Sequence, residues 1–424
     1  MSNRVVITGL GICAPNGVDI ASFTHALKNG ISGISFHQEL ADLEFGCQIG
    51  GKPPISKELL ANYFTPLQLR GLNATGIMYG VIAGIDAWKD AHLPIENNEQ
   101  PDWENGVIFG TGILGVDQFR EAIHLIDAKN TRRLGSTSVM QTMASGISAY
   151  LGGILGCGNQ VTTNSSACTT GSEGILMAYE RIKNGKATRI LTGSCSDSGP
   201  YVWGGFDAMR ILPRAYNDKP TKASRPMSVS AAGFVPGSGA GALVLESLES
   251  ALNRGATIYA EVLGGAVNSG GQRGEGTMTA PNSEAVQRCI TDAIKDAKID
   301  KNDIDVVNGH LTATSKDGLE IENWSKALER NQLDFPYINS FKATVGHCLA
   351  AAGSIESVAS ILQFKEGVIF ENTNCEDLNP DIEAIVHPTK IPRKTVAYKP
   401  NIIAKASFGF GDVNACVIFK NYLS

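Results

Sequence analysis

The segment VTTNSSACTTGSE, residues 161–173, predicts a strand that turns through small and hydroxyl side chains into a helix. A strand joined directly to a helix is the building unit of α/β proteins. The turn places Cys168 at the N-terminus of the predicted helix, where free backbone N–H groups and the helix dipole favour a thiolate. The segment therefore indicates both a fold class and a candidate nucleophile.

The helix that follows Cys168 has a weak copy later in the chain. Four positions of the segment 171–185 recur in the segment 353–367 at a constant offset of 182 residues: Gly171-Ser172 and Lys183-x-Gly185 match Gly353-Ser354 and Lys365-x-Gly367. Both segments are typical of helices that a glycine enters and a glycine caps. The repeat predicts a duplicated architecture.

The rest of the chain alternates between two kinds of apolar pattern. Short apolar runs predict buried strands at Val5–Thr8, Val107–Gly110, Ile190–Gly193 and Ala242–Glu246. Helical periodicity appears at residues 175–182 and again at 284–297. This alternation favours the α/β class. The duplication places a boundary near residues 253–257, which predicts an N-terminal half, 1–253, with the nucleophile and a C-terminal half, 254–424, packed together as one unit.

Composition excludes several broad classes. The chain has 424 residues, is 43% hydrophobic and 18% charged, and carries a net charge of −6, so disorder and a global attraction to nucleic acid or an anionic membrane are not expected. No apolar run is long enough to span a bilayer, and residues 1–15 do not resemble a secretion signal. The nine cysteines are scattered without a C-x-x-C pair, which fits reduced thiols. We therefore expect a cytoplasmic protein that needs no metal.

A thiol nucleophile needs groups that handle protons, and two histidines have suitable surroundings. His310 follows Val306-Val307-Asn308-Gly309, where a predicted strand opens into a loop of hydroxyl side chains. His347 follows the segment Ser340–Gly346, just before the repeated helix. A lone histidine or cysteine is more often structural, but a thiol between small residues and two histidines in glycine-flanked loops favour catalysis. A cysteine hydrolase stays possible on these residues alone. A zinc site is disfavoured because the ligand spacing is missing.

An ordered set of motifs along nearly the whole chain resembles the β-ketoacyl-acyl-carrier-protein synthases of the elongating types I and II, including the ketosynthases of type II polyketide systems. The motifs are Val5-Val6-Ile7-Thr8-Gly9-Leu10-Gly11, Ala167-Cys168-Thr169-Thr170-Gly171, Ala223-Ser224-Arg225-Pro226, Asn308-x-His310-x-Thr312, Lys342-Ala343-Thr344-Val345-Gly346-His347, Gly353-Ser354-x-Glu356 and Phe408-Gly409-Phe410-Gly411. The resemblance implies the thiolase-like fold, in which two similar halves form αβαβα layers, and a dimer.

The resemblance also implies a reaction, the decarboxylative Claisen condensation of malonyl-acyl-carrier protein with an acyl group held on Cys168. His310 and His347 match the two catalytic histidines, which bind the malonyl thioester and promote loss of CO2. Lys342 matches the family lysine that orders the site electrostatically, together with Glu320. Phe408 matches the gating phenylalanine, and its backbone N–H is expected to share the oxyanion hole with that of Cys168. No cofactor is implied.

Further residues match positions that hold the substrates. Thr312 and Thr314 match those that bind the phosphopantetheine arm of the acyl-carrier protein. An apolar tunnel is implied, and its expected lining is Met140, Met143 and Ile113. Acyl-carrier proteins are acidic, so the enzyme needs a local basic surface, and the positions that resemble the family's docking residues are Arg70, Arg132, Arg133 and Arg210.

The chain departs from the family pattern beside the site. Leu311 and Asp412 stand where the family has glycine, and the segment 225–238 lacks the usual acidic and basic residues after Arg-Pro. These departures predict altered gating or substrate choice, in fatty acid or in type II polyketide or polyene biosynthesis. One alternative is a chain-length-factor-like partner subunit of a heterodimeric ketosynthase, which the retained Cys168 disfavours. A degradative thiolase is disfavoured because Cys416 does not match the second thiolase cysteine.

Overall fold

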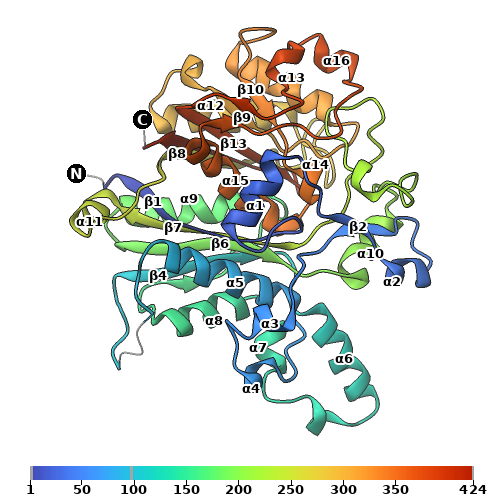
Figure 1. Cartoon of the computed structure of the whole chain (residues 1–424), viewed down its shortest axis with the longest axis vertical. Helices are drawn as coiled ribbons and strands as arrows, with labels where there is room; N and C mark the ends of the chain where they lie inside the picture. The colour runs from blue at the N-terminus through green and yellow to red at the C-terminus, as the bar shows by residue number, and fades with distance from the viewer. Residues whose placement is uncertain (1–2, 96–98, 423–424) are drawn as a thin grey trace.

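The computed structural model describes residues 3–95 and 99–422, which fold around a mixed sheet of ten strands (Figure 1). The strands lie in the order β10-β9-β13-β14-β8-β1-β7-β6-β4-β5. Their bounds are β1 Val5–Cys13, β4 Asn105–Thr111, β5 Val161–Thr162, β6 Arg189–Ser196, β7 Gly239–Ser247, β8 Ala260–Ser269, β9 Val306–Asn308, β10 Tyr337–Asn339, β13 Ile402–Gly409 and β14 Val413–Asn421. All the strands predicted from apolar runs are present.

The sheet consists of two five-strand halves with one topology. The order β5-β4-β6-β7-β1 in the first half corresponds to β10-β9-β13-β14-β8 in the second. In each half four strands run parallel to one another, and one strand, β7 or β14, runs antiparallel to both of its neighbours in that half. The halves join where β1 pairs with β8 over three residues. The predicted duplication is confirmed at the level of strand order.

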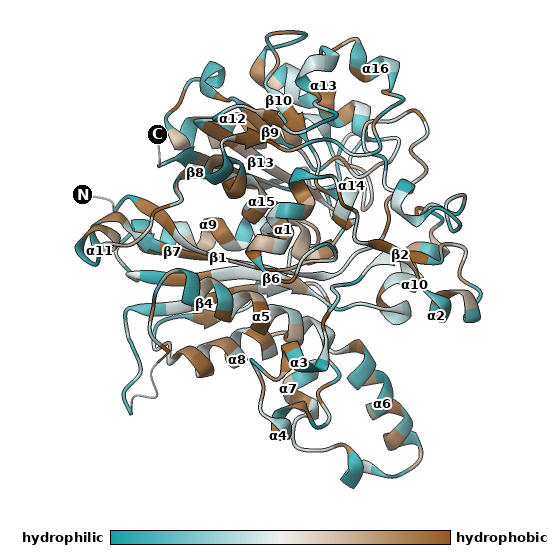
Figure 2. Cartoon of the chain, viewed as in Figure 1, coloured by the Kyte–Doolittle hydropathy of each residue, from teal (hydrophilic) through white to brown (hydrophobic). Residues whose placement is uncertain are grey.

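Helices separate and cover the two halves, giving the five αβαβα layers seen in Figure 1. The middle layer is α9 (Thr170–Lys183) with α15 (Ala352–Glu366), and the outer layers are α5 (Thr75–Asp90) with α8 (Gly146–Leu155) and α12 (Ser283–Ala297) with α13 (Asp317–Leu328). Three apolar clusters fill the spaces between the layers. Figure 2 shows hydrophobic residues along strands and on α8, as an α/β core requires.

The two copies of the repeat meet at their glycines. A Cβ on Gly171 would lie 2.3 Å from the backbone N of Ser354, and a Cβ on Gly353 would lie 2.6 Å from the backbone N of Ser172. These distances are shorter than any real Cβ contact, so α9 and α15 cross where only glycine fits. The neighbouring serines bond to the opposite half: Ser172 Oγ lies 2.9 Å from Ser407 Oγ, and Ser354 Oγ lies 2.7 Å from Ser194 Oγ.

The remaining elements are mostly short and lie around the layers. The helices are α1 Ile20–Lys28, α2 Gln38–Asp42, α3 Lys57–Leu60, α4 Pro66–Leu69, α6 Val116–Asp127, α7 Ser138–Thr142, α10 Pro200–Ala208, α11 Leu248–Asn253, α14 Lys342–Val345 and α16 Pro380–Glu383. Two further pairs of strands are β2 Ile34–Phe36 with β3 Ile49–Gly51, and β11 Val368–Ile369 with β12 Val396–Ala397. Helix α11 ends at Asn253, and we keep the division into 1–253 and 254–424 as a proposal.

Within the described residues, no helix is both long and apolar enough to cross a membrane.

Candidate active site

Cys168 lies in the loop between β5 and α9, as the sequence predicts. The turn is sharp, because Ala167 has a left-handed φ of 48°. Hydroxyl side chains close it: Thr169 Oγ1 donates to Ser166 O at 2.6 Å and Thr170 Oγ1 donates to Ala167 O at 2.7 Å. The run of small hydroxyl residues therefore holds the conformation that presents the thiol at the start of α9.

The thiol is not in the thiolate-favouring state that its place at a helix N-terminus predicts. Burial raises the pKa of Cys168 to about 11, and this effect outweighs the backbone N–H of Phe410 and the charge of Lys342, which both lower it. At neutral pH the group is therefore mostly a thiol. A nearby base has to accept its proton before the sulfur attacks a thioester.

His310 follows β9 and is held through its backbone. The N–H groups of His310 and Leu311 donate to the two carboxylate oxygens of Glu320 at 2.6 and 2.7 Å. The ring is buried, and its Nδ1 has no hydrogen-bond partner among the described residues. Burial, and then the charge of Lys342, lower the pKa of His310 well below its usual value. The imidazole is neutral at pH 7.

His347 follows α14 and has a fixed tautomer. Its Nδ1 accepts the backbone N–H of Leu349 at 3.1 Å, so in the neutral ring the proton lies on Nε2. Burial lowers the pKa of His347 well below its usual value, with Lys342 and Lys405 contributing in the same direction. His347 therefore offers a neutral Nε2–H donor, which the sequence analysis expected of a catalytic imidazole.

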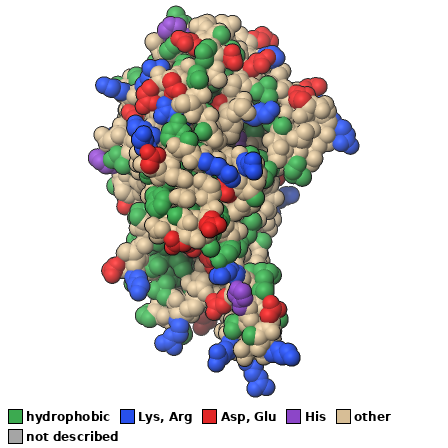
Figure 3. Space-filling view, turned by 90° about the vertical axis from the view of Figure 1, so that its right-hand side faces the viewer, with side chains coloured by type: hydrophobic (Ala, Val, Ile, Leu, Met, Phe, Trp, Pro, Cys, Tyr) green, Lys and Arg blue, Asp and Glu red, His purple; other side chains and the backbone are tan. Residues whose placement is uncertain are grey.

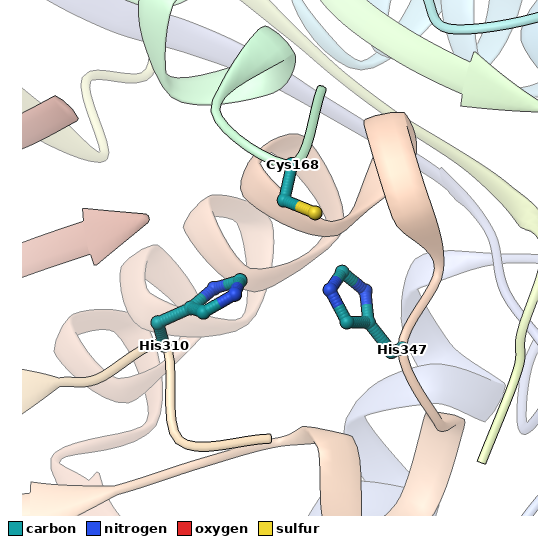
Figure 4. A group of neighbouring side chains, drawn as sticks. All are labelled: Cys168, His310 and His347. Carbon is teal, nitrogen blue, oxygen red and sulfur yellow. The ribbon is translucent and has the colours of Figure 1, made fainter. Parts of the chain in front are cut away.

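These three side chains converge from the two halves (Figure 4). The Cys168 sulfur points toward the space between the imidazoles, whose ring centroids are 5.2 Å apart at an interplanar angle of 83°. One donor atom from each residue lies within 4.8 Å of the others. Thiolate and imidazole are also zinc ligands, so this group is where a metal would bind. The absence of a metal requirement stays a prediction, and dialysis against EDTA is expected to leave activity unchanged.

Lys342 lies behind this group, and its ion pair is with Glu356, a partner that the sequence analysis did not assign to it. Its Nζ donates to Glu356 Oε1, and both side chains are 1% exposed. Lys342 is the first residue of α14, where its side chain reaches α15. Glu320 is instead occupied by the backbone of the His310 loop. Burial raises the pKa of Glu320 to about 7, and the charge of Lys342 acts in the opposite direction.

The assignment of the second oxyanion N–H to Phe408 also needs correction. Phe408 is still inside β13, paired with Asn414 of β14, and its ring packs 6.3 Å from that of His310. Phe410 is the first residue beyond the strand, and its backbone N–H is the one that bonds to the Cys168 sulfur. The N–H groups available beside the sulfur are thus those of Cys168 and Phe410, and the Phe410 ring also lines the cavity.

A cavity of about 690 Å³ leads to the three side chains. Thr312 and Thr314 line it, with their hydroxyl oxygens 3.1 Å apart, as expected for residues that bind a phosphopantetheine arm. Ile113 lines it as well. Met140 and Met143 are not among the described residues that line the cavity, so within this chain they do not form the predicted tunnel.

The departures at Leu311 and Asp412 stand at left-handed positions, with φ of 23° and 60°. Glycine adopts such angles without strain, which explains the family preference. Asp412 is held by what it binds: its carboxylate accepts the backbone N–H of Gln272 at 3.0 Å and that of Asn282 at 2.8 Å. It therefore ties the loop 270–282, which lines the cavity at Thr279 and Pro281, to the loop of Phe410.

The four predicted docking arginines are all exposed. Arg210 lies between the cavity-lining residues Met209 and Ile211. Arg70 ends α4, and Arg132 and Arg133 follow α6. Lys and Arg side chains gather at the lower end of the molecule in Figure 3, where α6 leads. None of the four arginines forms a salt bridge with another residue that the structure describes.

The sequence comparisons decide the family. Residues 2–251 match the description "Beta-ketoacyl synthase, N-terminal domain", and residues 259–376 match "Beta-ketoacyl synthase, C-terminal domain". The chain belongs to the beta-ketoacyl synthase family. It is 31% identical to the chloroplastic 3-oxoacyl-[acyl-carrier-protein] synthase I of Arabidopsis thaliana, covering 99% of this chain and 87% of that one. It is 32% identical to a putative mitochondrial 3-oxoacyl-[acyl-carrier-protein] synthase of Schizosaccharomyces pombe, covering 99% of each.

Solved ketosynthase structures have the same fold. A beta-ketoacyl synthase from Burkholderia phymatum STM815 superposes with a TM-score of 0.88 at 29% identity, over 99% of each chain. A ketosynthase solved in complex with its type II polyketide acyl-carrier protein gives 0.86 at 26%, covering 99% of this chain and 100% of that one. The ishigamide ketosynthase/chain length factor gives 0.87 at 25%, over 100% of each. This beta-ketoacyl synthase is therefore an acyltransferase that carries out condensation in fatty acid or polyketide biosynthesis.

Sequence reasoning missed three residues that the structure brings to the site. Glu356 was noted only as part of a motif, Lys405 was not noted, and the N–H of Phe410 was assigned to Phe408. A signal for Lys405 was present, because a lone lysine interrupts the apolar strand Ile402–Gly409. A lysine in a fully buried strand needs a partner. That partner, Glu356, is 49 positions away in the sequence, and only the fold reveals the pair.

Proposed function

We propose that Cys168 accepts an acyl group from an acyl-carrier protein and that His310 and His347 then drive its condensation with malonyl-acyl-carrier protein. The observation that carries the proposal is the convergence of one thiol and two neutral imidazoles within 4.8 Å, at the base of a cavity of about 690 Å³. A metal-free hydrolase shares the thiol and an imidazole, but family membership favours condensation.

In the first step, an imidazole takes the Cys168 proton. His347 is a poor acceptor because Leu349 already occupies its Nδ1, whereas no such bond fixes the tautomer of His310. We therefore assign the proton to His310. The sulfur attacks the thioester carbonyl, and the N–H groups of Cys168 and Phe410 face the oxyanion. The bond to the pantetheine sulfur breaks, and the pantetheine thiolate leaves with the proton.

In the second step, the malonyl carboxylate leaves as CO2 and its electron pair passes into the thioester as an enolate. The Nε2–H of His347 donates to the enolate oxygen, and His310 supports it. A neutral imidazole stabilises this oxygen without protonating the carbon, which keeps the carbon nucleophilic. That carbon attacks the acyl-Cys168 carbonyl, the C–S bond breaks, and a β-ketoacyl-carrier protein two carbons longer leaves. The Cys168 sulfur departs as a thiolate and takes a proton from solvent, which restores the thiol.

Intact-mass spectrometry tests this proposal. The protein is incubated with acyl-carrier-protein thioesters of several chain lengths and then with malonyl-carrier protein. Wild type is expected to gain one acyl mass and then lose it to a product two carbons longer, whereas Cys168→Ala gains none. Cys348→Ala, at a buried cysteine beside His347, is the matched control and is expected to acylate normally. Absence of acylation with every chain length would favour the chain-length-factor-like alternative.

We also propose that the acidic acyl-carrier protein docks on Arg70, Arg132, Arg133 and Arg210. They are exposed and form no ion pair with another described residue, which leaves their charges available to a partner. Charge reversal of Arg132 and Arg133 to Glu is expected to raise the KM for carrier-linked substrate about tenfold and to leave that for a small thioester unchanged. Arg288→Glu, on α12, is the control and is expected to change neither. An equal loss with both substrates would contradict the docking role.

The assembly we propose is a dimer, either of two copies or with a ketosynthase-like paralogue. Helix α6 exposes three apolar side chains, Phe119, Ile123 and Ile126, and β5 is an edge strand with Val161 exposed. Exposed apolar side chains and an edge strand of the described sheet each favour association. Analytical ultracentrifugation distinguishes the cases: a mass of about twice 44.9 kDa for the protein alone means a homodimer, and a doubled mass only with the paralogue means a heterodimer.

A cytoplasmic location of the protein stays a prediction.

A further inference from the structure

Lys405 is a buried cation that the mechanism above does not use. It lies in β13 with 0% exposure, and its Nζ is 2.7 Å from Glu356 Oε2. The same ammonium donates to the carbonyl of Ala406 and to Ser407 Oγ, the latter at 3.2 Å. A charge held this deeply is strongly destabilising unless it is paired, so its retention calls for an explanation.

The pairing of Lys405 is incomplete, because Glu356 also binds Lys342. Two ammonium groups thus share one carboxylate, and none of the three side chains is more than 1% exposed. The group carries one excess positive charge. The next acidic group that interacts with Lys405 is Glu320, which burial keeps largely protonated below neutral pH. Positive charge therefore remains behind the active site.

Lys405 contacts the supports of all three catalytic side chains. Glu356 lies on α15, which follows His347. In the sheet register Lys405 stands opposite Asn308, two residues before His310. Ser407, which accepts from Lys405, bonds to Ser172 in the first turn of α9, just after Cys168. One side chain is thus connected to the elements that place the thiol and both imidazoles.

The duplicated scaffold does not need this charge. Ser194 and Ser407 occupy equivalent places in β6 and β13, since each bonds to the serine that opens the opposite middle helix. Two residues earlier, β13 has Lys405 and β6 has Thr192. Two residues after the helix serines, α15 has Glu356 and α9 has Gly174. The same fold is built in one half with the charges and in the other without them.

We propose that Lys405 is a positioning residue for the condensation, which holds Glu356 against Lys342 and supplies a second positive charge behind His310 and His347. The inference rests on the histidine roles proposed above. Burial is the larger effect that opposes protonation of both rings, and the charge of Lys405 adds to it, so both rings stay neutral. The charged groups that act on both rings are Lys342 on α14 and Lys405 on β13, and the rings lie beside each other and the Cys168 thiol. Glu320 on α13 binds the backbone of the His310 loop and interacts with Asp317, and Glu356 on α15 interacts with Cys168.

The test is the pH profile of kcat for condensation in Lys405→Met, and in Lys405→Thr, which has the residue of the equivalent place in β6. Without the cation the imidazoles protonate more readily. On lowering the pH, these variants are therefore expected to lose activity at a higher pH than wild type does. A shift of the acid limb by about one unit lowers kcat about tenfold on that limb. The KM for malonyl-carrier protein and kcat above pH 8 are expected to stay within about twofold. Lys405→Arg keeps the charge and is expected to keep the limb in place.

The matched control is Arg254→Met. Glu246, which is 0% exposed, also binds two cations, Arg254 and Arg189, each at 2.7 Å, but at the opposite end of the strands β6 and β7. This variant is expected to lower Tm without moving the acid limb. An unmoved limb in folded Lys405→Met, or failure of both neutral variants to fold while Arg254→Met folds, would overturn the inference. If wild type itself forms no β-ketoacyl product, the proposed function fails instead.

Discussion

The N-terminal and C-terminal halves of this synthase have one strand order but carry different chemistry. What they share is structural: the glycines at which α9 and α15 cross, the serine pairs, and a buried aspartate after the equivalent strands β6 and β13. Asp197 accepts the backbone N–H of Gly76 in α5, and Asp412 accepts that of Asn282, the N-cap of α12. What they do not share lies around the catalytic group.

The difference separates fold from function. The first half contributes the Cys168 thiol, and at the places equivalent to Glu356 and Lys405 it has Gly174 and Thr192, which bear no charge. The second contributes both imidazoles and the buried ions Lys342, Glu356 and Lys405. A duplicated scaffold that has Thr192 and Gly174 in one half, where the other half has Lys405 and Glu356, does not require ions at those positions. We infer that the asymmetric residues serve the reaction, and that the symmetric ones serve stability.

The largest expected effect comes from a substitution of one catalytic histidine of the C-terminal half. His347→Asn removes the Nε2–H that faces the enolate, and we expect decarboxylation of malonyl-carrier protein to fall by about 10²–10⁴-fold. Acylation of Cys168 is expected to stay within about tenfold, because His310 is the assigned base. Rapid-quench measurement of each half-reaction checks this. Equal losses in both steps would contradict the division of roles between His310 and His347.

A second test concerns Glu320, a buried carboxyl of the C-terminal half. Burial raises its folded-state pKa to about 7 from the ordinary 4.5, so its protonated form stabilises the fold at low pH. That contribution is present below pH 4.5 and is lost as the pH rises through about 7. The unfolding free energy of wild type relative to Glu320→Gln is therefore expected to fall by about 2 kcal/mol between pH 5 and 8. Urea denaturation at each pH measures it, and a difference that rises with pH would refute the assignment.

A third test breaks what the halves share. Gly171→Ala puts a Cβ 2.3 Å from the backbone N of Ser354, and Gly353→Ala puts one 2.6 Å from that of Ser172. Each substitution is expected to destabilise the fold by about 1–3 kcal/mol through overpacking. Gly153→Ala in α8 meets no atom within 4 Å and is the control. Thermal unfolding compares the three variants, and a crossing that tolerates either alanine would show that the glycines are dispensable.

The smallest expected effect lies in the loops beyond the equivalent strands. Asp412→Gly relieves a left-handed φ of 60° but releases the backbone N–H groups of Gln272 and Asn282. We expect a change in stability within about 1 kcal/mol. The loop of Phe410 becomes freer, so acylation by longer chains is expected to rise about twofold to fivefold relative to short ones. Competition between acyl-carrier thioesters checks this, and an unchanged chain-length profile would mean that Asp412 does not restrict the gate.

The sequence was sufficient where a local pattern determines the outcome. Apolar runs located the strands, the repeat at an offset of 182 residues located the crossing helices, and the turn around Cys168 located the nucleophile. It failed where the result depends on which side chains meet across the fold. The ion pair of Lys342 with Glu356 on the next helix was not predicted. The oxyanion N–H was assigned to Phe408 instead of Phe410, because β13 extends through Gly409.

The prediction that Cys168 favours a thiolate failed for a related reason. A helix N-terminus favours a thiolate, but burial in the assembled site has the larger effect and raises the pKa of Cys168 to about 11. Burial is a property of the whole fold. The sequence identified the nucleophile and two candidate histidine bases, but not the direction in which the fold shifts the pKa of the thiol.

The most direct test of the division between the halves is CO2 release from malonyl-carrier protein by Cys168→Ala. This variant lacks the nucleophile but keeps His310, His347, Lys342, Glu356 and Lys405. The account predicts that it still releases CO2 and forms acetyl-carrier protein, within about tenfold of the wild-type decarboxylation rate, while condensation is abolished. Loss of CO2 release together with condensation, in a folded protein, would contradict it, because decarboxylation would then need the N-terminal half's thiol.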